Sequence, residues 1–261
     1  MELIGEAPAL LGAAAEGGGG GGHGADDLTE ERTGQRCRPS HRDGNGGANV
    51  LDGRAGADVM TGYGGSDTFH VDNAGDRTVE VRVRGSDAVT DTVVASVGYA
   101  LKAGENIEVL RTIDAAGKAA INLTGNAYGQ TVVGNNGANV LNGDLGQDVL
   151  TGRGGADTFV FDTALGAGNV DRITDFSAPA DTIRLENAIS TALGAGELAS
   201  DRFKDLGVAG AKLDASDRIV YDRTTGVLSY DADGSGTKAA MVQVALIDTK
   251  AVLTAADFFV V

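Results

Sequence analysis

The sequence predicts an all-β fold in which short strands alternate with tight turns. Two compositional observations support this: 41 of the 261 residues are glycine, and aromatic residues make up only 5% with no tryptophan. Glycine weakens helices and suits turns. The third observation is a nonapeptide that recurs in two blocks, residues 44–70 and 134–160. Self-similarity at a fixed period is typical of repeat folds.

The two blocks have the same internal pattern. Residues 44–70 read GNGGANVLD, GRAGADVMT and GYGGSDTFH, and residues 134–160 read GNNGANVLN, GDLGQDVLT and GRGGADTFV. A degenerate unit, GNAYGQTVV, begins at Gly125. A flexible linker has no reason to keep Asp or Asn at the sixth position and a large apolar residue at the eighth. A phosphate-binding glycine loop would need a GxxxxGK[ST] or GxGxxG motif in a suitable setting, and neither is present.

These nonapeptides resemble the RTX, or hemolysin-type, repeat G-G-x-G-x-D-x-U-x, which binds Ca2+. The resemblance implies a parallel β-roll, a calcium-stabilised nonapeptide solenoid in which two repeats complete one coil of 18 residues. Repeats two apart then lie on the same edge, which places Asn49 near Asp67 and Asn139 near Asp157. Asp58 and Asp148 lie on the opposite edge of their blocks. We expect incomplete sites there, because Gln130 precedes Asp148 and nothing regular precedes Asp58.

Calcium is a hard cation that prefers six to eight oxygen ligands. The candidate ligands are the sixth residues of the repeats and the backbone of the first glycines, which allow the turn to close. They are Asn49, Asp58, Asp67, Asn139, Asp148 and Asp157, with Gly44, Gly53, Gly62, Gly134, Gly143 and Gly152.

The last three positions of each repeat suit a short strand whose middle residue points inward. We expect these residues to form a stacked core: Leu51, Met60, Phe69, Leu141, Leu150 and Phe159.

Residues 44–160 are expected to form the roll, with repeats at 44–70 and 125–160 and a β-rich insert at 71–124. The insert contains β-leaning runs such as DTVVASVGYAL and AAINLTGN. The 90-residue offset between the blocks equals ten nonapeptides, so the insert could preserve the coil register. Coincidence is the alternative.

Residues 161–261 are predicted to form a C-terminal antiparallel β cap and to contain a secretion signal. RIVYD, GVLSYD and AMVQVALI have the pattern of antiparallel strands, and ELASDRF suggests a short helical turn. The segment after the repeats is similar to that of serralysin-type proteases. The ending LTAADFFVV resembles a type I secretion signal, and a buried last strand is the alternative. DADGSG at 231–236 begins like an EF-hand loop, but Val242 stands where a glutamate is expected, which favours a hairpin turn.

Residues 1–43 are expected to be low in complexity and disordered. Gly21–Thr29 fits a degenerate repeat with Asp26 at position six, and the register is then lost around Cys37. The first residues lack a basic stretch, so we expect no cleaved N-terminal signal peptide. We expect no membrane span, because no run of 18 uncharged apolar residues occurs. A net charge of −16 disfavours nucleic acid as a partner.

No catalytic residues are expected, because the sequence contains neither HExxH nor GxSxG. The sequence and the resemblance together imply a non-enzymatic calcium-binding module of an extracellular, secreted protein. It would be exported unfolded by type I secretion machinery and would fold on Ca2+ outside the cell. One alternative is an adhesin-like module that binds polysaccharide or a cell surface, for which Arg54, Tyr63 and Arg153 are candidates. Another is the non-catalytic C-terminal part of a secreted protease or other RTX enzyme.

Overall fold

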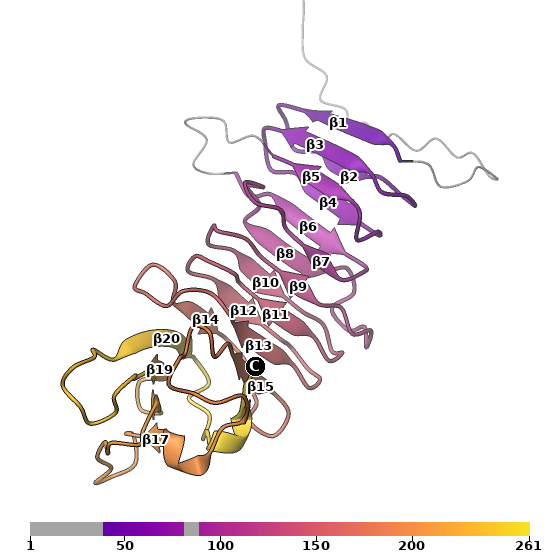
Figure 1. The fold of residues 1–261 in the computed structure, drawn as a ribbon. Coiled ribbons are helices and arrows are strands. Elements are labelled where there is room, and N and C mark those ends of the chain that lie inside the picture. The colour runs from indigo at the N-terminus through magenta and orange to yellow at the C-terminus, as the bar shows by residue number, and fades with distance from the viewer. Residues whose placement is uncertain (1–38, 81–88) are drawn as a thin grey trace, which may run out of the picture. The chain divides into compact units, whose positions relative to one another are not determined.

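The computed structural model describes residues 39–80 and 89–261, and this part of the chain is almost entirely β-structure. The degenerate repeat at Gly21–Thr29 and Cys37 lie outside the described residues. The strands form two rows that face each other, and Figure 1 shows successive strands alternating between them.

The first row is a run of parallel strands within an 11-stranded sheet. Each strand pairs with the strand two places later in the chain. The row contains β2 (Val50–Asp52), β4 (Thr68–Val71), β6 (Thr92–Ala95), β8 (Val109–Thr112), β10 (Thr131–Val133), β12 (Val149–Thr151) and β14 (Asp171–Ile173).

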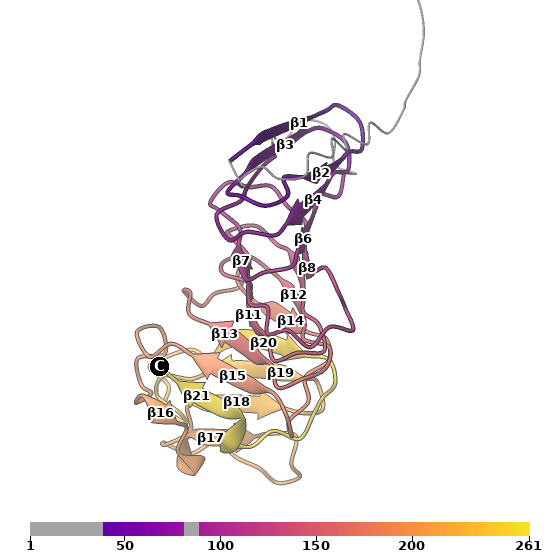
Figure 2. The ribbon, with the colours of Figure 1, turned by 90° about the vertical axis from the view of Figure 1, so that its right-hand side faces the viewer.

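The second row is built from two parallel sheets on the opposite side of the roll, as the turned view in Figure 2 shows. The first of these contains β1 (His41–Asn45), β3 (Val59–Tyr63) and β5 (Arg77–Val79). The second begins with β7 (Tyr99–Ala100), β9 (Leu123–Thr124), β11 (Val140–Asn142), β13 (Thr158–Phe161) and β15 (Thr182–Leu185). The predicted parallel β-roll is therefore confirmed.

Within the blocks, one coil takes 18 residues, as predicted: Val50 pairs with Thr68, and Val140 pairs with Thr158. The insert uses coils of other lengths, for example from Thr68 to Thr92. As a result β2 and β11, which occupy equivalent places in the two blocks, lie in different sheets. The 90-residue offset therefore does not preserve the register, because the chain makes four and a half coils over it.

The inward residues form the expected core. In the first row, Leu51, Phe69, Val93, Leu110, Val132, Leu150 and Ile173 lie in register and are at most 6% exposed. The second row contributes Met60, and then Tyr99, Leu123, Leu141, Phe159 and Ile183. The six residues predicted from the eighth position are all buried, which confirms the strand direction that the nonapeptide specifies.

The C-terminal part closes the roll with antiparallel strands. Three consecutive strands form an antiparallel meander: β18 (Ile219–Asp222) pairs with β19 (Val227–Tyr230), and β19 pairs with β20 (Val242–Ile247). β20 also pairs in parallel with β14, the last strand of the first row. β21 (Phe258–Val260) adds to β15 and pairs with β16 (Gly196–Glu197), while β17 (Phe203–Asp205) pairs with β18. The antiparallel cap is thus confirmed, and it extends both rows so that their last edges are covered.

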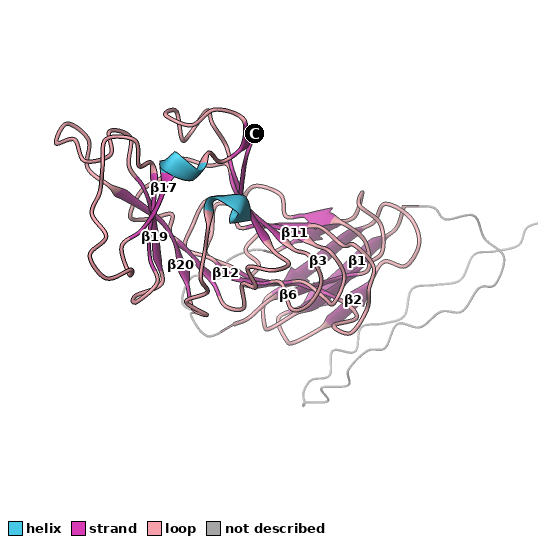
Figure 3. Ribbon diagram, turned by 90° about the horizontal axis from the view of Figure 1, so that it is seen from below, coloured by secondary structure: helices cyan, strands magenta, loops and turns pink. Residues whose placement is uncertain are grey.

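The helical content of the described residues consists of two short 3₁₀ turns, η1 (Ser200–Arg202) and η2 (Ala255–Asp257), both in this C-terminal part (Figure 3). Neither is long or apolar enough to cross a membrane.

The roll begins earlier than the sequence predicts. β1 starts at His41 and pairs in parallel with β3, so residues 41–43 are a strand although they fall in the stretch expected to be disordered. The segment HRDGN lacks the nonapeptide pattern. Its backbone is ordered by hydrogen bonding to a neighbouring strand, a tertiary effect that local sequence does not report.

Candidate calcium sites

In the second and third repeats of each block, the second and fourth residues fix the turn. Arg54, Tyr63, Asp144 and Arg153 occupy the second position with φ between 61° and 74°, which is unusual for residues other than glycine. The fourth residue is a glycine with positive φ in the same repeats. At Gly65 an added Cβ would also lie 2.5 Å from the carbonyl carbon of Gly47 in the preceding coil. Both the backbone conformation and the close approach of coils therefore require glycine there.

The sixth-position carboxylates join neighbouring coils. Asn49 donates its backbone N–H to Asp67 Oδ1 at 2.7 Å, and Asn139 donates to Asp157 Oδ1 at 2.8 Å. The predicted pairings of Asn49 with Asp67 and of Asn139 with Asp157 are therefore confirmed. Asp58 Oδ1 likewise accepts the N–H of Ser40, and Asp148 Oδ1 that of Gln130.

The second oxygen of each of these carboxylates is buried and accepts no hydrogen bond. This holds for Oδ2 of Asp58, Asp67, Asp148 and Asp157, whose side chains are at most 1% exposed. A buried carboxylate oxygen without a donor is costly, so native structures pair it or place it beside a cation. Four such oxygens at equivalent places point to a common ligand.

The space beside these oxygens is kept open by the first glycine of the repeat. A Cβ at Gly53 would lie 2.7 Å from Asp58 Oδ2, and Gly62, Gly143 and Gly152 face their own Asp in the same way.

In the repeats with asparagine at the sixth position, carbonyl oxygens of the next coil border the equivalent space. A Cβ at Gly44 would lie 2.8 Å from the carbonyl oxygen of Gly62 and beside Asn49 Oδ1. At Gly134 the corresponding oxygens are those of Gly152, 2.9 Å away, and of Asn139. The surrounding donors are therefore carboxylate, amide and carbonyl oxygens, the set that Ca2+ prefers.

The carboxylate series continues beyond the repeats. Asp58 donates its backbone N–H to Asp76 Oδ1 at 2.9 Å, and Asp148 donates to Asp171 Oδ1 at 3.1 Å. The prediction that Asp58 and Asp148 have poor partners therefore holds for the preceding coil, which offers Ser40 and Gln130, but not for the following coil.

In the same way, Asp67 donates its backbone N–H to Asp91 Oδ1, and Asp157 donates its backbone N–H to Asp181 Oδ1. Sequence reasoning missed these four partners. Asp91, Asp171 and Asp181 are separated from the repeats by coils of 23 or 24 residues, whereas Asp76 lies a regular 18 residues after Asp58 but outside a nonapeptide. A usable signal existed: each lies at or directly before the first residue of a strand and stands two residues before an inward-facing residue, namely Thr78, Val93, Ile173 or Ile183.

Burial makes four of these carboxyl groups unusually weak acids, namely those of Asp91, Asp148, Asp157 and Asp171. It raises the pKa of Asp157 to about 6, with further contributions from Asp181 and Asp175, and the pKa of Asp91 also to about 6. Burial, followed by repulsion from Asp171, raises the pKa of Asp148, and burial raises that of Asp171. Burial therefore makes the ionised forms of these carboxylates costly in the fold, and a bound cation would offset that cost.

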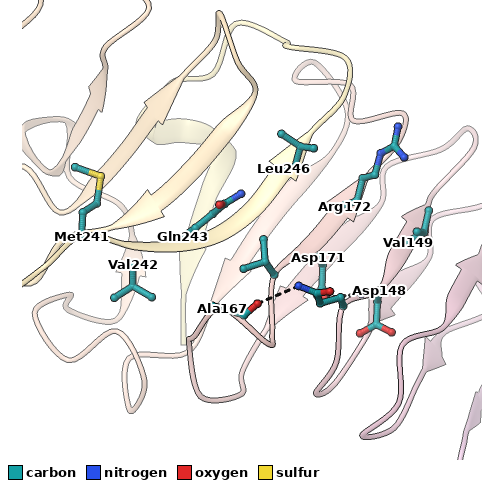
Figure 4. Close-up of a pocket in the computed structure, with 11 residues that line it drawn as sticks. Asp148, Val149, Ala167, Asp171, Arg172, Met241, Val242, Gln243 and Leu246 are labelled. Carbon is teal, nitrogen blue, oxygen red and sulfur yellow. Dashed lines mark hydrogen bonds between the residues drawn. The ribbon is translucent and has the colours of Figure 1, made fainter.

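Asp148 and Asp171 also border a cavity of about 570 Å3 between the roll and the cap. Figure 4 shows both carboxylates on one side of it, with Val242, Gln243 and Leu246 of β20 opposite. Gln147 Nε2 donates a hydrogen bond to the carbonyl oxygen of Ala167 at 3.0 Å and so holds the loop that contains Ala167.

The EF-hand-like segment is a hairpin connection. It joins β19 to β20, Asp231 Oδ1 accepts the N–H groups of Asp233 and Gly234, and Asp233 Oδ2 accepts those of Lys238 and Ala239. These carboxylates organise the turn, in line with the interpretation that the sequence favoured.

Comparison with known families agrees with the geometry. The model of the RTX calcium-binding nonapeptide repeat matches residues 43–77 and 124–159, with four copies. No curated protein matches the chain. The matched segments contain all the sixth-position residues discussed above except the partners Asp91, Asp171 and Asp181. The chain thus carries two segments, residues 43–77 and 124–159, that match the RTX calcium-binding nonapeptide repeat.

Proposed function

We propose that this chain is a module that folds on binding Ca2+ outside the cell and is exported by type I secretion machinery. The observation that carries the proposal is the set of four buried Oδ2 atoms without hydrogen-bond donors, at Asp58, Asp67, Asp148 and Asp157. Asn49 and Asn139 contribute amide oxygens, and the first glycines of the repeats contribute carbonyl oxygens and space. Bound calcium supplies positive charge and accepts these oxygens as ligands.

Calcium binding and folding are coupled because each site draws on two coils. Asn49 and Gly62 belong to successive coils of one edge, and so do Asn139 and Gly152. The unfolded chain holds these groups far apart and therefore cannot reproduce the site. A ligand that binds the folded state alone stabilises it in proportion to the logarithm of its free concentration. With a net charge of −16, the calcium-free chain also repels itself.

The site favours Ca2+ over Mg2+. Its donors come from turns and include several carbonyl or amide oxygens, which suits the longer bonds and higher coordination number of Ca2+. Mg2+ requires a near-octahedral shell and loses its water reluctantly.

Export before folding agrees with the position of the last strand. Phe258 and Val260 of β21 are each 1% exposed, and β21 pairs with β15 and β16. A secretion apparatus that reads this C-terminal segment must therefore act before the roll closes. Millimolar calcium outside the cell would then drive closure, since extracellular calcium modules bind with Kd on the order of 10⁻⁴ to 10⁻³ M.

We propose binding rather than catalysis. Among the described residues, the one group of three or more His, Cys, Asp or Glu close enough to share a metal contains carboxylates alone. An adhesin-like role in polysaccharide binding has less support. Arg54 and Arg153 follow strands five places apart in the first row, and Tyr63 lies in the opposite row, so these candidates do not form one surface cluster.

The test is a far-UV circular dichroism titration of the full chain with Ca2+, with Mg2+ as the control. We expect a coil-to-β transition specific to Ca2+, which a double variant with Asp67→Ala and Asp157→Ala shifts to higher concentration or abolishes. An unchanged spectrum up to millimolar Ca2+, or an equal response to Mg2+, would overturn the proposal.

A further inference from the structure

Glu80 stands where a regular repeat would have its first glycine. In the parallel pairing of β3 with β5, Val59, Met60 and Thr61 lie opposite Arg77, Thr78 and Val79, so the next residues in register are Gly62 and Glu80. The following coil of the roll begins with β6, and Asp91 precedes that strand just as the sixth residue precedes the strand in a repeat. Glu80 and Asp91 thus keep the first and sixth places of a repeat, although more residues separate them than in a regular nonapeptide.

The glutamate side chain takes the place of a carbonyl ligand. At Gly44, Gly125 and Gly134, the first glycine of the next coil directs its carbonyl oxygen at the space beside the glycine. At Gly62 the nearest atom to that space is Glu80 Oε1, and the next is Asp67 Oδ2. A neutral peptide oxygen is therefore replaced by a charged one at this coil.

Three carboxylates meet at this point. Ligand oxygens of Asp67, Glu80 and Asp91 all lie within 4.8 Å of one another, the one such grouping in residues 39–80 and 89–261. Asp67 and Asp91 are 0% and 2% exposed, and Asp67 Oδ2 has no hydrogen-bond donor and is directed into the group. Three negative charges in a site closed to water are strongly unfavourable unless a cation is present.

We propose that Asp67, Glu80 and Asp91 form a calcium site of higher charge than the nonapeptide sites, and that it fills first. This inference rests on the proposed calcium-dependent folding. Affinity in oxygen-ligand sites increases with the number of charged ligands. The site also joins Glu80 and Asp91 to the last coil of the first block, so it fixes the register at the point where the repeat is lost.

The second block supplies a contrast within the same chain. Asp175 follows β14 and lies opposite Gly152, so it occupies the place that Glu80 has in the first block. Its two oxygens accept the N–H groups of Gly152 at 2.9 Å and Arg153 at 2.7 Å. Asp175 is thus directed at the backbone, and the corresponding third ligand is missing beside Asp157. We therefore expect the tightest calcium to be associated with the first block.

The test is isothermal titration calorimetry of the full chain with Ca2+, supported by native mass spectrometry at limiting calcium. Glu80→Gln removes the charge at constant size, and Glu80→Gly restores the residue of a regular repeat. We expect either change to weaken the tightest site by roughly tenfold or more and to leave the weaker sites in place. Glu197→Gln, at an exposed position of β16, controls for the loss of one negative charge.

The outcomes separate the two proposals. A weaker tightest site in both Glu80 variants, with the wild-type circular dichroism spectrum at saturating calcium, supports the three-carboxylate site. If Glu80→Gln fails to fold, Glu80→Gly still decides the question, because it restores the repeat's own residue. Equal tight binding by the wild type, a folded Glu80 variant and Glu197→Gln would overturn this inference alone. Absence of calcium binding by the wild type would overturn the proposed function as well.

Discussion

Replacing Asp157 by asparagine separates the structural role of this carboxylate from its role as a ligand. The amide oxygen of the new side chain can still accept the N–H of Asn139, which now bonds Asp157 Oδ1 at 2.8 Å. The change removes the negative charge and the buried Oδ2, which has no donor. Calcium-free and calcium-bound stability should therefore change in opposite directions.

The magnitude follows from the acidity of the group. Burial raises the pKa of Asp157 from 3.8 to about 6, a difference equivalent to at most about 3 kcal/mol against the ionised fold near neutral pH. Access of water to the turn screens part of this. Without calcium, Asp157→Asn should gain about 1–2 kcal/mol in free energy of unfolding. With saturating calcium it should lose about 1–3 kcal/mol, since a charged ligand is gone.

The assay is urea unfolding followed by far-UV circular dichroism, once with chelator and once with millimolar calcium. Asp201→Asn, an exposed site whose side chain is 61% accessible, controls for net charge. An equal loss of stability with and without calcium would show that the charge of Asp157 does not serve calcium binding, and the reasoning would then be refuted.

Three further predictions follow. Gly152→Ala places a methyl group against Asp157 Oδ2 and should weaken calcium binding roughly tenfold or more by calorimetry, whereas Gly166→Ala, with no atom within 4 Å, should not. Phe159→Ala empties a fully buried place beside Phe176 and should cost about 3–5 kcal/mol in calcium-saturated urea unfolding, while Phe259→Ala, 43% exposed, should cost less than about 1 kcal/mol. Because the fold raises the pKa of Asp91 and Asp157 from 3.8 to about 6, their protonated forms stabilise the calcium-free chain below about pH 4, and this stabilisation is lost as pH rises through about 6. Calcium binding should release protons across that window, measurable by calorimetry in buffers of different ionisation enthalpy, and calcium-free stability that increases from about pH 4 to 7 would contradict the reasoning.

The roll and its core could be predicted from the sequence because the residues within one nonapeptide specify both the turn and the inward-facing residue of the strand. A fixed eighth position gives the inward residue, and Leu51 and Phe159 are buried as expected. The pairing of Asn49 with Asp67 followed from the 18-residue coil. The repeat therefore predicts contacts between coils wherever the two residues are separated by a regular 18-residue coil.

What the sequence did not reveal depends on coils of irregular length. Asp91 meets Asp67 across 24 residues and Asp171 meets Asp148 across 23, so counting by nines finds neither. The 90-residue offset suggested a preserved register for the same reason, and the structure shows a half-coil shift. Glu80 carries no repeat pattern, and its place opposite Gly62 is set by pairing of β3 with β5.

Closing a coil and forming a calcium site are two different requirements, and a nonapeptide meets both. A coil needs only a short strand with one inward residue, and Val93 and Leu110 satisfy this within the insert, where no nonapeptide occurs. A calcium site additionally needs a first glycine to leave space and a fourth glycine to let the coils approach, as at Gly62 and Gly65. Insert coils therefore close mainly by apolar burial, although Asp76 and Asp91 at the start of the insert contact the first block, whereas both blocks bury carboxylates that require a cation. Calcium dependence should for this reason be concentrated in the blocks, and hydrogen exchange should protect β8 at lower calcium concentrations than β12.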